Sequence, residues 1–204
     1  LRYQRELFPD VDYVFKLDSD EVLEPGLLAT GVHVLDGDRG AVVCHFRPRF
    51  VDSEGRDEAR DCGLARKLAV HGWPRWASHR MPPPAALWMF IRYDNIIASS
   101  CAFIRRVTLE SLAVPWWDER VAWAADYEMW TRLGPLGAIR YVSDVAVRCR
   151  RSPDSSTVVT PVEIRRQDVC RIALRAFRRS WVLLGPVRAA ALLPVVLKKW
   201  WYTL

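Results

Sequence analysis

Short apolar segments that alternate with helix-like stretches limit the fold of this chain more than any other feature. Apolar runs rich in β-branched and aromatic residues predict buried strands. We expect such strands at residues 11–17, 41–51, 96–104 and 139–147. Stretches of helical character lie between or after these runs, at residues 27–35, 106–112, 121–133 and 161–184. Strands and helices in alternation predict an α/β protein with one sheet and flanking helices.

Two further regions carry weaker signals. Residues 1–8 have the character of a helix end. Residues 57–90 are rich in Trp, Pro and His and contain three consecutive prolines, which disfavour regular structure. We therefore expect a long surface loop there. Its Trp residues have two interpretations, core filling or stacking on a ring-shaped ligand. They are Trp73, Trp76 and Trp88.

Length and charge narrow the class of protein. A chain of 204 residues suits one domain, or one domain with an appendage. We place the boundary after residue 157, so that a C-terminal helical tail occupies residues 158–204. The net charge of +6 favours anionic partners, and the basic residues concentrate late in the chain. No zinc-finger, RNA-binding or homeodomain pattern is present in the sequence, so we do not expect nucleic acid as a partner.

The cysteines indicate the redox compartment. The five are Cys44, Cys62, Cys101, Cys149 and Cys170. Their odd number, wide spacing and lack of a CxxC pair argue against a disulfide scaffold or a zinc site. We therefore expect a protein of a reducing, cytoplasmic environment.

The stretch DYVFKLDSDEVLEPGLL, residues 12–28, drives an apolar strand directly into carboxylates. In an open α/β sheet, ligands lie beyond the carboxyl ends of the strands, where Asp18 and Asp20 stand. Two carboxylates at i and i+2 can converge on one hard divalent cation, which also accepts phosphate oxygens. The alternative is that Asp18 or Asp20 caps a turn or the following helix.

Three motifs in order give the carboxylates a context. VFKLDSDEVLEPGLL resembles the D-x-D region of GT-A glycosyltransferases, most closely the large inverting family 2 that uses sugar nucleotides. DNIIASSCAFIRRVTLESLA, residues 94–113, is similar to the segment of that family that passes the acceptor site. Residues 117–157, with ADYEMWTRL and the later RCRRSPDSST, look like its D-Y-E-x-W-x-R-L helix, strand and basic loop. The resemblance covers roughly residues 1–157 and implies a partial GT-A, Rossmann-like sheet.

The resemblance also implies roles for individual residues. Asp18 and Asp20 would hold Mg²⁺ or Mn²⁺ on the diphosphate of a nucleotide-sugar donor. Asp126 would act as general base on an acceptor hydroxyl, which attacks the anomeric carbon and inverts it. The remaining assignments are Arg150 and Arg151 to the donor diphosphate, and Asn95, Ser99, Trp116 and Trp117 to a glycan or lipid-linked acceptor.

Other residues of the ADYEMWTRL helix have competing interpretations. Asp126 itself is also suited to complement the dipole of a helix start. Glu128, two positions on, is the second candidate for the base. We expect Trp130 and Arg132 to serve in packing and structural ion pairing.

Two features depart from the family pattern. RCRRSPDSS has Arg151 and Ser152 where many members carry a His that joins the metal shell. Either a metal ligand is missing here, or the Arg residues take over the diphosphate charge directly. The family's N-terminal half, with its nucleotide-reading Asp, has no counterpart before Leu1. We therefore expect that residues 1–204 alone do not turn over a donor.

The tail has two interpretations. Residues 181–197 are strongly apolar, are interrupted by Gly185, Pro186, Arg188 and Pro194, and are followed by Lys and Trp residues. Seventeen helical residues span only about 25 Å, short of a hydrocarbon core of about 30 Å. The pattern suits a helix lying in the interface of an anionic membrane, peripheral at the inner face of the cell membrane. It equally suits a helix packed on the domain or on a partner.

Two other functions fit parts of the chain. The first is a haloacid-dehalogenase-like phosphatase, in which Asp18 is the nucleophile and Asp20 the acid/base. The second is an inactive or partial domain that binds a sugar, a membrane or a protein partner.

Overall fold

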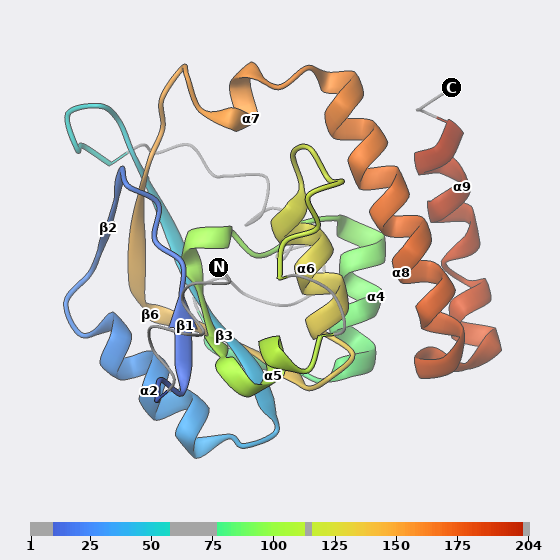
Figure 1. Cartoon of the computed structure of the whole chain (residues 1–204), viewed down its shortest axis with the longest axis horizontal. Coiled ribbons are helices and arrows are strands. Elements are labelled where there is room, and N and C mark those ends of the chain that lie inside the picture. The colour runs from blue at the N-terminus through green and yellow to red at the C-terminus, as the bar shows by residue number, and fades with distance from the viewer. Residues whose placement is uncertain (1–9, 58–76, 113–115, 202–204) are drawn as a thin grey trace.

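The computed structural model describes residues 10–57, 77–112 and 116–201. Figure 1 labels the elements. The strands are β1 (Tyr13–Phe15), β2 (Glu21–Leu23), β3 (Ala41–Val51), β4 (His79–Met81), β5 (Ala102–Arg105) and β6 (Ala138–Arg150). The helices are α2 (Leu27–Gly37), α4 (Pro83–Tyr93), the 3-10 turn η1 (Ser99–Cys101), α5 (Arg106–Glu110), α6 (Ala125–Leu133), α7 (Ser156–Val159), α8 (Val162–Ala190) and α9 (Leu193–Trp201).

The six strands form one mixed sheet in the order β1-β5-β3-β6-β2, with β4 also paired to β6. Only β3 and β6 pair in parallel, and the other pairs are antiparallel. Strands β1 and β2 lie at opposite ends of this order, yet only residues 16–20 join them. Six Cα–Cα steps lead from Phe15 to Glu21 and span at most about 22 Å. This short connection therefore links the two ends of the curled sheet directly.

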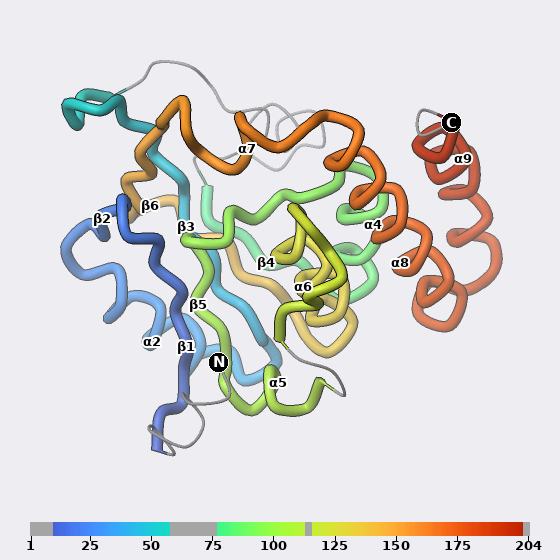
Figure 2. The backbone as a smooth tube through the Cα atoms, turned by 45° about the horizontal axis from the view of Figure 1, so that its top comes forward, coloured from blue at the N-terminus to red at the C-terminus, as the bar shows by residue number. Residues whose placement is uncertain are grey.

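Helices cover both faces of the sheet (Figures 1 and 2). On one face, α2 buries Leu27 and Leu35 in a cluster with Phe46 and Phe103. A Cβ on Gly31 would lie 2.9 Å from the Phe103 ring, so glycine lets this helix approach the sheet. The helices α4 and α6 build the larger core on the other face. The expected α/β class with flanking helices is thus confirmed at this coarse level.

The C-terminal helices form further layers. Helix α8 packs on α4 and α6, and α9 packs on α8 and α4. One buried cluster joins α4, α8 and α9. It contains Leu87 and Ile91 of α4, Phe177 of α8, Val196 of α9, and Leu192 just before α9. Gly185, at φ 75°, breaks the helical geometry of α8 just before Pro186. Among the described helices none is by itself long and apolar enough to cross a bilayer, whereas α8 and α9 meet that test together across a 92° bend.

The prediction of a loop over 57–90 is wrong for its second half, which contains β4 and α4. The prolines start α4 rather than prevent it, because Pro82 is its N-cap and Pro83 and Pro84 fill the first turn, where no amide hydrogen is needed. Trp88 packs partly buried against the core, so core filling explains it. Trp73 and Trp76, like residues 1–8, lie outside the described residues.

Other boundaries shift by a few positions. Strand β3 has the predicted bounds. The predicted strand at 96–104 begins as the turn η1 and becomes β5 only at Ala102. Helix α6 begins at Ala125 rather than at residue 121, and α8 continues past Gly185 to Ala190.

Candidate active site

The carboxylates of the opening motif lie in the connection between β1 and β2. Strand β1 ends at Phe15, and the amide of Glu21 closes a turn on the carbonyl of Asp18 at 3.2 Å. The Asp18 side chain is half-buried and that of Asp20 is exposed. Glu21 is half-buried at the start of β2, and burial raises the pKa of its carboxyl, partly offset by hydrogen bonding from Ser100. Three carboxylates are therefore presented on one short connection, as its sequence predicts.

Asp126 lies in the first turn of α6, at the other side of the site. Its Oδ2 accepts a hydrogen bond of 2.7 Å from Nδ2 of Asn95. Asn95 in turn accepts the amide of Ile97 at 3.2 Å, which fixes its side chain. Burial raises the pKa of Asp126, and Asn95 and the charge of Lys16 offset part of that rise. A carboxylate with a raised pKa is a stronger base than an exposed one.

Lys16 joins these two parts of the site. Its ammonium is ion-paired with Asp18 and lies 3.5 Å from the hydroxyl of Ser99. It also lies 5.8 Å from the centre of the Trp117 ring, within the range of a cation–π contact. Since its charge also acts on Asp126, Lys16 connects the residues that the sequence assigns to metal, acceptor and base. The sequence reasoning missed Lys16, although a lysine between an apolar strand and a carboxylate cluster is a visible signal.

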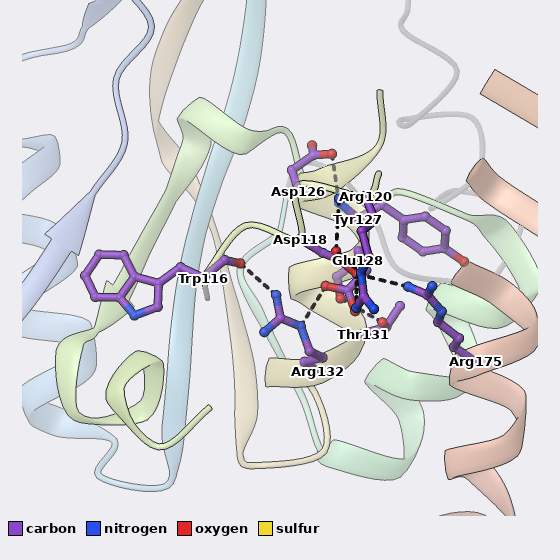
Figure 3. A network of polar contacts seen from close by, with 9 residues as sticks. All are labelled: Trp116, Asp118, Arg120, Asp126, Tyr127, Glu128, Thr131, Arg132 and Arg175. Atoms are coloured by element: carbon purple, nitrogen blue, oxygen red, sulfur yellow. Dashed lines mark hydrogen bonds and ion pairs between the residues drawn. The ribbon is translucent and has the colours of Figure 1, made fainter. Parts of the chain in front are cut away.

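The loop that leads into Asp126 is held by polar contacts at several points (Figure 3). The carbonyl of Trp116 accepts a hydrogen bond of 2.7 Å from Arg132. Asp118 is paired with Arg120 at 2.8 Å and with Arg175 of α8 at 3.1 Å, and these hydrogen-bonded arginines hold its pKa well below the ordinary value. The amide of Trp123 donates to Asp168 of α8 at 2.7 Å. The start of α6 is thus anchored to α8.

Glu128 has a structural contact instead of a position suited to a base. Its carboxylate pairs with Arg132 at 2.7 Å, and the side chains are 4% and 6% exposed. Trp130 is fully buried, and its indole donates to the carbonyl of Ile97 at 3.1 Å. The expected packing role of Trp130 and ion-pairing role of Arg132 are confirmed.

The two candidate arginines lie at the end of β6 and directly after it, near the strand pairing of β6 with β2. Glu21 pairs with Cys149 and Val22 with Arg148. Arg150 is the last residue of β6, directly after the partner of Glu21. Arg151 lies with its guanidinium 4.3 Å from the centre of the Phe50 ring. Arg150 and Arg151 are both exposed.

The remaining acceptor candidates differ in placement. Asn95 and Ser99 face Asp126 and Lys16 through the contacts above. Trp116 and Trp117 pack partly buried against the core, and only Trp117 contacts Lys16. His79 lies in β4 with its ring 5.1 Å from that of Tyr141, which is a packing position, and His71 lies outside the described residues.

A pocket of about 440 Å³ lies beside Asn95. Asp94, Trp123, Arg165, Arg166 and Lys199 line it. Asp94, at φ 64°, is ion-paired with Lys199 of α9, and Arg165 lies 5.8 Å from the centre of the Trp123 ring. The C-terminal helices therefore form one wall of this pocket.

The residues offer only part of a metal site. Within the described ranges, no group of three or more His, Cys, Asp or Glu is arranged to hold a metal ion. Asp18 and Asp20 supply oxygen donors of the kind that Mg²⁺ and Mn²⁺ prefer, but Asp18 is paired with Lys16. The donor set fits such a cation only where a diphosphate and water complete the shell.

Comparison with known proteins leaves the family open. The chain matches no protein-family model, and it matches no curated protein at a significant level. The case for a function therefore rests on the site itself.

Proposed function

We propose that this chain carries the acceptor side and metal side of an inverting glycosyltransferase of the GT-A type. Such an enzyme moves a sugar from a nucleotide-diphosphate donor to a hydroxyl acceptor. The observation that carries the proposal is Lys16, which is ion-paired with Asp18 and hydrogen-bonded to Ser99, and whose charge also lowers the pKa of Asp126. These carboxylates come from elements far apart in the sequence, and their distinct environments suit one to phosphate chemistry and the other to proton transfer.

The donor side consists of Asp18, Asp20, Arg150 and Arg151. The two carboxylates would hold Mg²⁺ or Mn²⁺, which when bound supplies Lewis-acid stabilisation of the departing diphosphate. Arg150 and Arg151 would add charge-assisted hydrogen bonds to phosphate oxygens, for which the planar guanidinium is suited.

The acceptor side centres on Asp126. Its carboxylate would take the proton from the acceptor hydroxyl as that oxygen attacks the anomeric carbon opposite the diphosphate. Two hydrogen bonds orient the carboxylate: Asn95 donates to Oδ2, and the backbone amide of Tyr127 donates to Oδ1. The acceptor would be a glycan or a lipid-linked molecule, and the pocket lined by Asp94, Trp123 and Lys199 would receive part of it.

Binding of nucleoside diphosphates tests the proposal without knowledge of the acceptor. Calorimetric titration of the full chain with uridine, guanosine and thymidine diphosphates, with and without Mn²⁺, should show Mn²⁺-dependent binding of at least one. We expect Asp18→Ala and Asp20→Ala to weaken that binding at least about tenfold, because each removes a charged ligand. Glu163→Ala, an exposed carboxylate of α8, is the matched control and should bind like the unaltered chain.

The competing functions predict other results. A covalent aspartyl-phosphate at Asp18, trapped with a phosphate ester, would identify a phosphatase. Binding of a diphosphate that is indifferent to Mn²⁺ and to both aspartates would contradict the proposed donor site.

A further inference from the structure

Helix α9 has two apolar faces. Val196 in the helix and Leu192 just before it are almost fully buried against α4 and α8. Lys199 lies on the same side and reaches Asp94. This inner face explains why the helix docks on the domain.

The outer face is defined by Leu193, Leu197, Trp200 and Trp201. These residues follow the spacing i, i+4, i+7 and i+8, which places them on one side of a helix. They are 43%, 53%, 51% and 73% exposed. Helix α9 is the outermost layer in both views (Figures 1 and 2).

Two apolar side chains of α8, on either side of its kink, are also exposed. Val182, near the end of the straight part of α8, is 94% exposed, and Val187, just after the kink, is 83% exposed. Large apolar patches of this kind mark interaction surfaces rather than ordinary protein surface.

The charge of the same segment selects the partner. Residues 169–204 contain seven Arg and Lys residues and no Asp or Glu. The net charge of the chain is +6, so this segment carries all of the excess and the rest of the chain is nearly neutral. Arg188 and Lys198 are exposed beside the outer face of α9. A second copy of the chain would bring like charges together, whereas an anionic surface complements them.

We propose that the outer face of α9 docks on a bilayer containing anionic lipid. The helix lies in the plane of the interface, because its inner face is occupied by the domain and only the outer face is available to acyl chains. Leu193 and Leu197 enter the apolar boundary, Trp200 and Trp201 lie at the headgroup level, and the basic residues contact lipid phosphates. This inference is independent of the glycosyltransferase proposal.

Vesicle flotation of the full chain provides the test. Vesicles of phosphatidylcholine with about one-third phosphatidylglycerol should carry the protein, and vesicles of phosphatidylcholine alone should carry at least about tenfold less. The triple variant Leu197→Ser/Trp200→Ser/Trp201→Ser should lose binding to the anionic vesicles by more than tenfold, judged roughly from the apolar area removed. Lys198→Gln/Arg188→Gln should weaken it several-fold, roughly, and make it less sensitive to salt.

Two controls keep the test decisive. Val158→Ser/Val159→Ser removes two apolar side chains of α7 that are 61% and 62% exposed, and should float like the unaltered chain. Brominated acyl chains should quench tryptophan fluorescence of the unaltered protein. The conservative Trp200→Phe/Trp201→Phe should keep binding and lose most of that quenching, even if the serine variant fails to fold.

Three results would overturn the proposal. They are equal binding to zwitterionic and anionic vesicles, retention of binding by a folded triple variant, and absence of quenching by brominated lipid. A concentration-dependent dimer that the triple variant abolishes, without any flotation, would assign the face to a second copy instead.

Discussion

Removal of the Glu128 carboxylate should destabilise the fold by about 3–5 kcal/mol, the usual cost of breaking a buried ion pair. The pair with Arg132 is 2.7 Å long, and its side chains are only 4% and 6% exposed. Exposed i,i+4 pairs stabilise a helix by only about 0.3–0.5 kcal/mol, but this pair is buried and that value does not apply to it. Glu128→Ala leaves the Arg132 guanidinium in the core without this carboxylate. For a chain of this size the loss corresponds to a melting temperature lower by about 6–20 °C.

The double variant Glu128→Leu/Arg132→Leu separates charge burial from lost packing. It removes both charges, so the desolvation penalty disappears with the ion pair. It also removes the hydrogen bond from Arg132 to the carbonyl of Trp116, which costs about 1–3 kcal/mol if that carbonyl stays unsatisfied. We therefore expect the double variant to be more stable than Glu128→Ala.

Urea denaturation followed by circular dichroism measures these differences. The matched control is Glu110→Ala, which disrupts the i,i+4 pair with Arg106, where both side chains are 23% exposed and the separation is 3.6 Å. It should cost less than about 1 kcal/mol. Two results would refute the reasoning on the buried pair. One is a loss of unfolding free energy in Glu128→Ala no larger than in Glu110→Ala, and the other is a double variant less stable than Glu128→Ala.

Three further predictions concern titrating groups. Burial raises the pKa of Asp126 in the fold, so the stability that its protonated form contributes is present below pH 3.8 and is lost as pH rises through the folded pKa. In thermal denaturation, Asp126→Asn should therefore melt at a higher temperature than the unaltered chain at pH 7 and at the same temperature at low pH. Lys16→Met removes a charge that lowers the pKa of Asp126, so the pKa of Asp126 followed by NMR titration should move further up, and an unchanged pKa would contradict the electrostatic link. Burial lowers the pKa of His45 to about 3. The free energy of unfolding that neutral His45 contributes is therefore complete above pH 6.5, and it falls towards pH 3 by at most about 1.4 kcal/mol per pH unit. In urea denaturation, His45→Phe should make this decline shallower.

The sheet-forming segments were predictable where the signal is local. Strand β3 is an apolar, β-branched run with turn residues at each end, and its predicted bounds are those of the structure. Helix α4 was missed because a proline triplet has two local meanings. It prevents a helix interior but suits a helix start, and only the burial of Leu87 and Phe90 on the sheet decides between them.

Part of the candidate site was also predictable. The position of Asp18 and Asp20 after a strand follows from the apolar run that precedes them. The contact between Asn95 and Asp126 does not follow from any local pattern, because 31 positions separate the two residues. The assignment of both to the acceptor side came from the resemblance, and the structure brings them within hydrogen-bonding distance.

The sequence by itself determined the α/β class, the carboxylate-rich connection after β1, and a basic, apolar C-terminal segment, because periodicity and composition act over a few residues. Tertiary structure alone decided which charges meet. It paired Lys16 with Asp18, buried Glu128 with Arg132, and left apolar side chains of α9 exposed. Such contacts depend on the curl of the sheet and the stacking of helices, which bring distant segments together and leave no trace in local sequence pattern.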